Sequence, residues 1–384
     1  MKRPDDREAV VAKRAIIGAA AALVVIGFAA SRVDHAPVDA ALPTSVRSLA
    51  VVAPADTDAV TGPLSHGVAL EIAKTLRGVN GVRVVSADGK GYLNSQQLRK
   101  LLNVGAILEV RLHRLDRGLH LELSLKADGD STLLVHTYRV SGDNLRGAEI
   151  AGATRVGDVL RAQIGLPRTD GIRTAKSRSP EAHDLLLRAL GLQARADLQS
   201  REVATRLLET ALRFDGGYAD VWSELAVNSE ATNDTARARL TACRAIELDS
   251  TLASPHVVLG DLHWIRRDTA AAARAYLTAI RLDPQLPRAR YHYSQLLSQL
   301  GRKDEALREA RRAHELAPLA PDIHANYARM LARAGREPES RHETAELRRV
   351  TGMLQSARSV SPARKRADHG TQDSRIGVRA AGRD

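Results

Sequence analysis

The chain has 384 residues, a formal net charge of +12 and a single cysteine, Cys243. One cysteine excludes a disulfide within the chain and a metal site built from several thiolates. Phe, Trp and Tyr make up only 3% of the residues, too few for the core of a β-sandwich or barrel, whereas abundant alanine and leucine favour closely packed helices. Residues 1–14 hold five basic and three acidic groups, and residues 355–384 hold seven basic and three acidic ones. Because part of the excess charge lies in these two ends, we expect no nucleic-acid partner.

Residues 15–31 are predicted to be a transmembrane anchor or a signal segment. The stretch AIIGAAAALVVIGFAA has no charge and no proline, and its 16 residues fall slightly short of the ~20 that span a bilayer. The basic stub 1–14 precedes it, and this asymmetry predicts a cytoplasmic amino terminus. A cleavable signal peptide explains the same features, but we favour an uncleaved anchor. The expected localisation is the bacterial inner membrane, single-pass, with residues 33–384 periplasmic, or, after cleavage, secretion to the periplasm.

After a linker at 32–45, residues 46–166 alternate short apolar runs with helical stretches. The short runs predict strands and the longer stretches predict helices. Asp128-Gly129-Asp130 is a strong hairpin signal between the last two strands. The expected order is βαβαβββα, a small mixed-sheet α/β domain. The strands are expected at 48–54, 81–86, 106–113, 119–126 and 132–140, and the helices at 63–76, 95–102 and 144–164.

This segment resembles the small TolB amino-terminal-like α/β domain of bacterial membrane-anchored repeat proteins and regulators. The likeness rests on SLAVVAP, on the turn Leu64-Ser65-His66-Gly67, on VNGVRVVSA and on LRKLLNVGAILEVRL. The family usually has an acidic residue in the turn where this chain has His66. The resemblance implies a mixed sheet with helices packed on it.

Two short motifs in this domain fail as catalytic signatures. A nucleophile elbow needs glycines two residues before and after its serine, and Pro63 stands at the first of these positions around Ser65. A phosphate-binding loop needs Ser or Thr after its lysine, whereas Gly91 follows Lys90. We therefore expect no catalytic residue and no cofactor, and we do not expect an enzyme.

After a linker at 167–180, residues 181–354 repeat at a fixed step of about 34 residues. Small or helix-ending residues recur in register without an insertion across four units. Two-helix units explain this pattern, because small residues let paired helices approach closely and Pro or Gly ends the second helix. The columns are Ala204, Ala238, Ala272 and Ala306; Ala211, Ala245, Ala279 and Ala313; Ala226, Gly260, Ser294 and Ala328; and Gly216, Ser250, Pro284 and Pro318.

These columns resemble the tetratricopeptide repeat (TPR), whose units carry a Trp, a Leu-Gly pair, alanines and a final Pro. Units are expected at 185–218, 219–252, 253–286, 287–320 and a decayed 321–354, followed by a disordered basic tail at 355–384. The resemblance implies an all-α TPR solenoid whose concave face binds a peptide or helix of a protein partner. We assign Trp222, Ala204, Ala211, Ala238, Ala245, Gly260, Ala272, Ala279, Ala306 and Ala313 to repeat packing. We assign Asp261, Trp264, Arg288, Tyr291, Gln295, Arg329 and Arg333 to the partner-binding groove.

His256 and His263 lie on one predicted helix face and raise the question of a metal. They occupy positions where the repeat keeps large packing residues, and two imidazoles without a third ligand make a poor zinc site. We therefore expect no metal.

Three functions agree with this organisation. The first is a non-catalytic, membrane-anchored TPR scaffold that binds a protein partner in the bacterial cell envelope. The combination of segments also resembles the extracytoplasmic part of bacterial membrane-bound regulators, which predicts an accessory component of a signalling or transcription-regulatory system without its own DNA-binding domain. The third is an envelope or cytochrome assembly factor.

Overall fold

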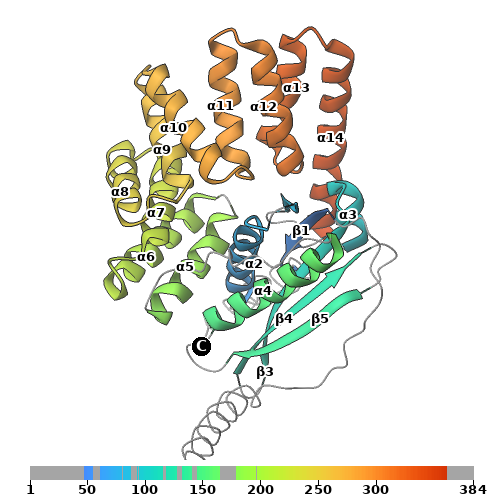
Figure 1. Ribbon diagram of the computed structural model, residues 1–384, viewed down its shortest axis with the longest axis vertical. Coiled ribbons are helices and arrows are strands. Elements are labelled where there is room, and N and C mark those ends of the chain that lie inside the picture. The colour runs from blue at the N-terminus through green and yellow to red at the C-terminus, as the bar shows by residue number, and fades with distance from the viewer. Residues whose placement is uncertain are drawn as a thin grey trace, which may run out of the picture.

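The computed structural model describes residues 47–54, 61–79, 81–87, 93, 95–115, 118–127, 132–140, 145–164, 179–195 and 197–360. A small mixed sheet with its helices is followed by a solenoid of helical hairpins (Figure 1), as the sequence predicts. The strands are β1 (Ser48–Val52), β2 (Arg83–Ser86), β3 (Ala106–Leu115), β4 (Gly118–Lys126) and β5 (Thr132–Val140). The helices packed on them are α2 (Thr61–Leu76), α3 (Ser95–Leu102) and α4 (Leu145–Ile164).

The sheet has the strand order β2-β1-β3-β4-β5. β1 pairs in parallel with both β2 and β3, whereas β3, β4 and β5 form an antiparallel meander. Because β2 and β3 lie on opposite sides of β1, right-handed crossovers place α2 and α3 on opposite faces. Successive β1 side chains follow this division: Leu49 packs in the core with α2 and α4, and Ala50 packs in the core with α3.

The solenoid consists of five helical hairpins within the described residues. Their helices are α5 (Pro180–Gln193) and α6 (Leu198–Phe214), α7 (Ala219–Ala231) and α8 (Thr235–Leu248), α9 (Ser254–Ile265) and α10 (Thr269–Leu282), α11 (Pro287–Gln299) and α12 (Lys303–Leu316), and α13 (Pro321–Arg333) and α14 (Glu337–Val360).

The turns inside the hairpins repeat in backbone geometry as well as in sequence. Asn233, Arg267, Gly301 and Gly335 each stand one repeat period after the previous one, and all have positive φ, between 62° and 77°. A residue in the left-handed conformation ends a helix and redirects the chain, and asparagine and glycine adopt this conformation with little strain. The hairpins α7/α8, α9/α10, α11/α12 and α13/α14 are therefore equivalent units.

The small residues of the repeat lie where the paired helices meet. The alanines of the two predicted columns, at positions 204, 238, 272 and 306 and at 211, 245, 279 and 313, are fully buried, with 0% of each exposed. A Cβ atom added to Gly260 would collide with the ring of Tyr276. Trp222 is half-buried, and its indole N–H donates to the carbonyl of Gly216. Small side chains thus set the close approach of the helices.

The α/β domain contacts both ends of the solenoid. At the first end, α2 crosses α5 so closely that a Cβ atom on Gly67 would overlap the carbonyl of Leu187, and one on Gly191 would overlap the carbonyl of Pro63. At the other end, Val350 of α14 packs in the same core as α3 and the second face of β1. The arc of hairpins is therefore closed by the α/β domain (Figure 1).

Polar contacts join the middle of the arc to the same domain. The Gln285 side chain accepts from the Val84 amide (2.8 Å) and donates to the Val82 carbonyl (2.9 Å) at the edge strand β2. The Arg77 guanidinium lies 3.2 Å from the Asp283 carboxylate. These contacts satisfy polar groups that an edge strand otherwise leaves open.

Two expectations need correction. The predicted inner-membrane localisation is wrong as far as the structure tests it, because no helix among the described residues is long and apolar enough to cross a bilayer. Residues 15–31, to which the anchor was assigned, lie outside the described residues. The predicted tail at 355–384 begins too early, because α14 extends to Val360. From residue 355 on, the sequence contains no helix-breaking residue before Pro362, and a proline disfavours helical geometry in the residue that precedes it, which explains why the helix extends this far.

Candidate partner-binding face

The first helices of the hairpins form the inner layer of the solenoid. Contacts link α5 to α7, α7 to α9, α9 to α11 and α11 to α13, whereas consecutive second helices of the described hairpins share no comparable contact. Closer spacing of the first helices makes their side concave. We call the side chains that this layer presents the inner face. The α/β domain packs against its first part, through α2 on α5.

Arg288 of α11 lies in a group of polar residues that we call the inner charged cluster: Glu230, Asp261, Tyr276, Arg288 and His292. The guanidinium contacts the Asp261 carboxylate at 3.1 Å and also the Glu230 carboxylate. It therefore joins α7, α9 and α11. The Tyr276 hydroxyl donates to Asp261 at 2.6 Å, and His292 Nδ1 lies 3.0 Å from the same carboxylate.

The pKa values of Asp261 and Glu230 are shifted in opposite directions within this cluster. Burial raises the pKa of Glu230 despite the positive charge of Arg288. Burial acts on Asp261 in the same sense, but the hydrogen bond and charge of His292, together with Arg288, lower the pKa of Asp261. Two nearby carboxyl groups beside one cation behave in this way because only one of them is fully compensated. Asp261 is the ionised partner of Arg288.

A second charged group joins α2 to α7. The Lys74 ammonium lies 2.5 Å from the Asp220 carboxylate and 3.4 Å from that of Glu71. Glu224, one turn further along α7, is half-buried beside them. Burial, with the charges of Glu71 and Asp220, raises the pKa of Glu224 to about 7, although Lys74 opposes the shift. Four ionisable side chains thus meet where the α/β domain touches the inner face.

Glu224→Gln is expected to change the pH dependence of stability. The folded protein holds a proton on Glu224 up to a pKa of about 7, above the ordinary value of 4.5, so its stability falls as pH rises between these values. The gap between these two values corresponds to about 3 kcal/mol, and because the side chain is partly exposed the ionised residue should cost about 2 kcal/mol above pH 7. Urea unfolding should therefore show the variant more stable than the parent at pH 8 and equal to it near pH 4. The exposed Glu202→Gln in α6 is the control, and an equal response of both variants contradicts the assignment.

Of the predicted groove residues, two belong to the inner charged cluster and the others lie outside it. Asp261 and Arg288 belong to the inner charged cluster. Trp264 donates to the Gln299 side chain at 2.7 Å, and Arg333 donates to the Ser298 hydroxyl. Tyr291 lies edge-on to His292, with ring centroids 4.8 Å apart. The remaining residues are Gln295, which is hydrogen-bonded to Tyr291, and Arg329, which is exposed.

Sequence reasoning missed Glu230, His292 and the α2 residue Lys74. The repeat contained a signal for Glu230, because it stands one repeat period before Trp264 and hence at the equivalent position. No such signal exists for Lys74, because its partner Asp220 lies far along the chain in another domain.

His256 and His263 belong to no group of metal-ligating side chains within the described ranges. His263 Nδ1 lies 3.8 Å from the carboxylate of Asp268 at an exposed hairpin turn. Burial and the charge of Arg281 lower the pKa of His256. A different set of three ligand-type residues, His314, His324 and Glu343, does come together at the end of the solenoid.

Residues 287–330, which cover α11, α12 and most of α13, match the tetratricopeptide repeat family. The hairpins α7/α8, α9/α10 and α13/α14 share the period and the turn geometry of this segment, and together these findings support a TPR protein. No curated protein sequence matches the chain.

Solved TPR structures overlap with nearly half of the chain. A thermophilic TPR protein of Thermus thermophilus is 17% identical, with a TM-score of 0.39, over 47% of this chain and 100% of that one. MamA of Desulfovibrio magneticus is 14% identical, with a TM-score of 0.35, over 46% and 98%. YrrB, described as a TPR protein with an unusual peptide-binding site, is 17% identical, with a TM-score of 0.30, over 44% and 89%. At these scores no property of those proteins transfers to this chain.

Proposed function

We propose that this protein is a non-catalytic scaffold that binds a segment of a protein partner along the part of the inner face formed by α9, α11 and α13. The observation that carries the proposal is the division of that face. The α/β domain packs against α5 and forms a salt bridge to Asp220 of α7. The domain also reaches the later repeats, but there through the turns before α11 and α13 and through α14, so we assign the partner-binding surface to α9, α11 and α13.

The side chains on this later part favour an acidic partner segment that carries aromatic residues. Two aromatic residues, Trp264 and Tyr291, are half-buried and stand on α9 and α11, and the exposed Arg329 and Arg333 stand on α13. Half-exposed aromatic residues and arginine are the types that dominate the binding energy of protein interfaces. Arginine also pairs with carboxylates through two parallel hydrogen bonds.

A photo-crosslinker at position 291 of the full chain tests where a partner binds. We expect it to capture one protein in cells, whereas a crosslinker at the exposed Arg274 on the second helix α10 should not. The captured protein is then purified and its affinity measured directly. A captured transcription regulator would assign the scaffold to a signalling system, and a captured assembly factor would assign it to biogenesis.

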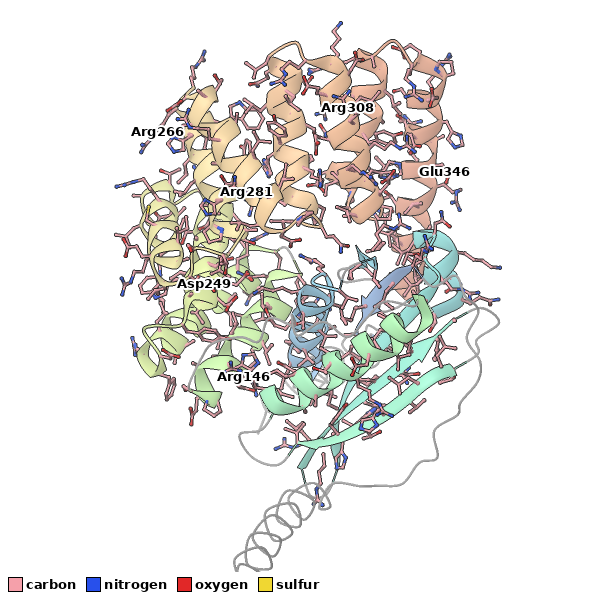
Figure 2. All side chains as sticks on the ribbon, in the orientation of Figure 1. Arg146, Asp249, Arg266, Arg281, Arg308 and Glu346 are labelled. Carbon is pink, nitrogen blue, oxygen red and sulfur yellow. The ribbon has the colours of Figure 1, made fainter. Side chains whose placement is uncertain are left out.

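Charge reversal on the inner face should weaken that purified complex. Arg329→Glu with Arg333→Glu is expected to lower the affinity at least tenfold, because each arginine then repels the acidic segment. Arg274→Glu with Arg281→Glu, two exposed arginines on α10 (Arg281 is labelled in Figure 2), is the matched control and should change the affinity less than twofold. Equal losses in both pairs, or no loss in either, would refute the proposed binding face.

A further inference from the structure

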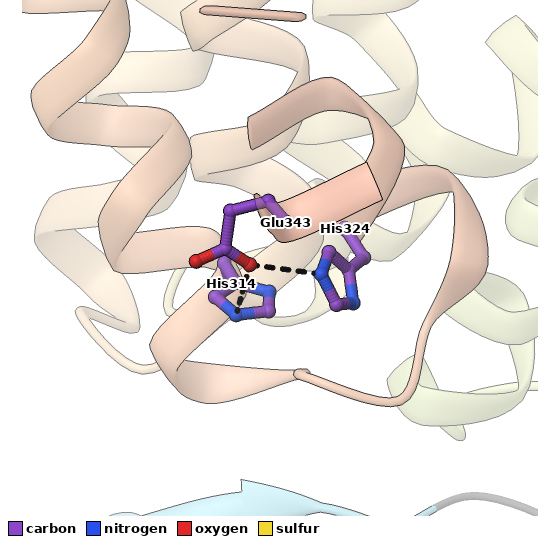
Figure 3. Close-up of side chains that lie close together, drawn as sticks. All are labelled: His314, His324 and Glu343. Carbon is purple, nitrogen blue, oxygen red and sulfur yellow. Dashed lines mark hydrogen bonds and ion pairs between the residues drawn. The ribbon is translucent and has the colours of Figure 1, made fainter. Parts of the chain in front are cut away.

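Three helices bring two imidazoles and a carboxylate together at the end of the solenoid (Figure 3). His314 lies in the last turn of α12, His324 in the first turn of α13 and Glu343 on α14. His324 Nε2 lies 2.9 Å, and His314 Nε2 3.9 Å, from the same carboxylate oxygen, Oε2 of Glu343. One ligand atom from each residue lies within 4.8 Å of the others.

The two histidines are an unusual choice for a packed helix junction. His324 is only 4% exposed, and its ring centroid lies 4.4 Å from that of His314. The Nδ1 atoms of both rings are buried and find no hydrogen-bond partner among the described residues. Buried polar atoms without partners are costly, so apolar side chains would stabilise this junction better than paired imidazoles do. Packing alone therefore does not explain why two imidazoles stand here.

We propose that His314, His324 and Glu343 bind a divalent first-row transition metal ion of the zinc type. Two imidazole nitrogens and one carboxylate oxygen form a donor set that zinc accepts, with water as the fourth ligand. Bonds of about 2.0–2.2 Å in a tetrahedral arrangement place the ligand atoms about 3.3–3.6 Å apart. The separations of 2.9 and 3.9 Å from the Glu343 carboxylate bracket this range, and all three ligand atoms lie within 4.8 Å of one another, so side-chain rotations would have to bring them to bonding distance of one ion.

Neighbouring residues hold the imidazole of His314 in place. The Tyr327 ring stacks on it, with centroids 5.1 Å apart and planes inclined by 16°.

A bound ion would brace the closure of the arc. The turn between His314 and His324 contains Leu319, which packs in the same core as Val350 of α14 and the α/β domain. The Glu315 carbonyl beside this turn also accepts from Arg83 of β2, at 3.4 Å. An ion that joins α12, α13 and α14 would therefore hold in place both the turn between α12 and α13 and the helix α14, which contact the α/β domain.

Metal titration of the untagged full chain tests the site. Zn²⁺ is expected to bind with a stoichiometry of one per chain and to raise the melting temperature, and Co²⁺ is expected to give the visible absorption of a nitrogen- and oxygen-ligated ion. His314→Gln with Glu343→Gln should weaken Zn²⁺ binding at least tenfold and abolish the thermal shift, with the helical circular dichroism unchanged. These two positions are half-buried, so they are safer to replace than the buried His324.

The surface pair His263 and Asp268 supplies the matched control, because it places an imidazole 3.8 Å from a carboxylate without a third ligand. His263→Gln with Asp268→Asn should bind Zn²⁺ as the parent does, and asparagine preserves the helix cap at position 268. If the double variant at 314 and 343 does not fold, His314→Gln alone is measured, with the same expected loss. The proposal would be overturned if the parent protein bound no Zn²⁺. It would also be overturned if the control variant at 263 and 268 lost as much Zn²⁺ affinity as the variant at 314 and 343.

Discussion

Gly191→Ala is expected to lower the free energy of unfolding by about 3 kcal/mol. The added methyl group overlaps the backbone carbonyl of Pro63, and a backbone atom in a helix cannot move aside as a side chain does. The helices α2 and α5 must therefore separate, which loosens the contact between the α/β domain and the first hairpin. Urea unfolding measures the loss, and limited proteolysis should separate the two parts faster than in the parent. Gly67→Ala meets the Leu187 carbonyl from the other side and should behave in the same way.

Gly352→Ala is the control for the glycine variants. Gly352 is an exposed glycine inside α14, and a Cβ atom there meets nothing within 4 Å. Alanine should stabilise the helix at this position by about 0.5–1 kcal/mol, because glycine is a poor helix former. The close crossing of α2 and α5 would be contradicted if Gly191→Ala were as harmless as Gly352→Ala.

Arg288→Gln is expected to cost about 2–3 kcal/mol, because it leaves the buried carboxylate of Asp261 and the half-buried carboxyl group of Glu230 without their shared cation. The side chain of Arg288 is 30% exposed, which keeps the expected loss at the lower end of the range for buried ion pairs. Adding Glu230→Gln should recover part of the loss, because it removes one of the two neighbouring carboxyl groups that repel each other once the cation is gone.

Thermal and urea unfolding of Arg288→Gln, the double variant and the exposed Arg274→Gln separate this cluster from a general charge effect. Arg274→Gln is expected to lie within about 0.5 kcal/mol of the parent. If Arg288→Gln were equally neutral, Arg288 would not be the residue that holds α7, α9 and α11 together.

The architecture of each part could be predicted because it is encoded in local patterns. The repeat period specifies the hairpins, and small residues such as Ala272 and Ala279 mark where their helices meet. Alternating apolar runs specify the mixed sheet. These signals are local, because every residue of a column has the same environment in its own repeat.

The contacts between the two parts could not be predicted. Gly67 and Gly191 each interrupt a helical stretch, which is the only local trace of their close crossing, and no pattern pairs one with the other. Likewise His314, His324 and Glu343 follow no common spacing in the sequence, and they meet only because three helices converge. The localisation depended on the hydropathy of residues 15–31 and on the basic residues before them, all outside the described residues, and no described helix is long and apolar enough to cross a bilayer.

Amide hydrogen exchange of the full chain, with and without the captured and purified partner, tests the central claim most directly. The claim is that the partner lies on the inner face of the later repeats. We predict that added protection is concentrated in α9, α11 and α13, at residues 254–265, 287–299 and 321–333, and that α8 and α10 exchange as in the free protein. Protection confined to the second helices or to the α/β domain would contradict the account.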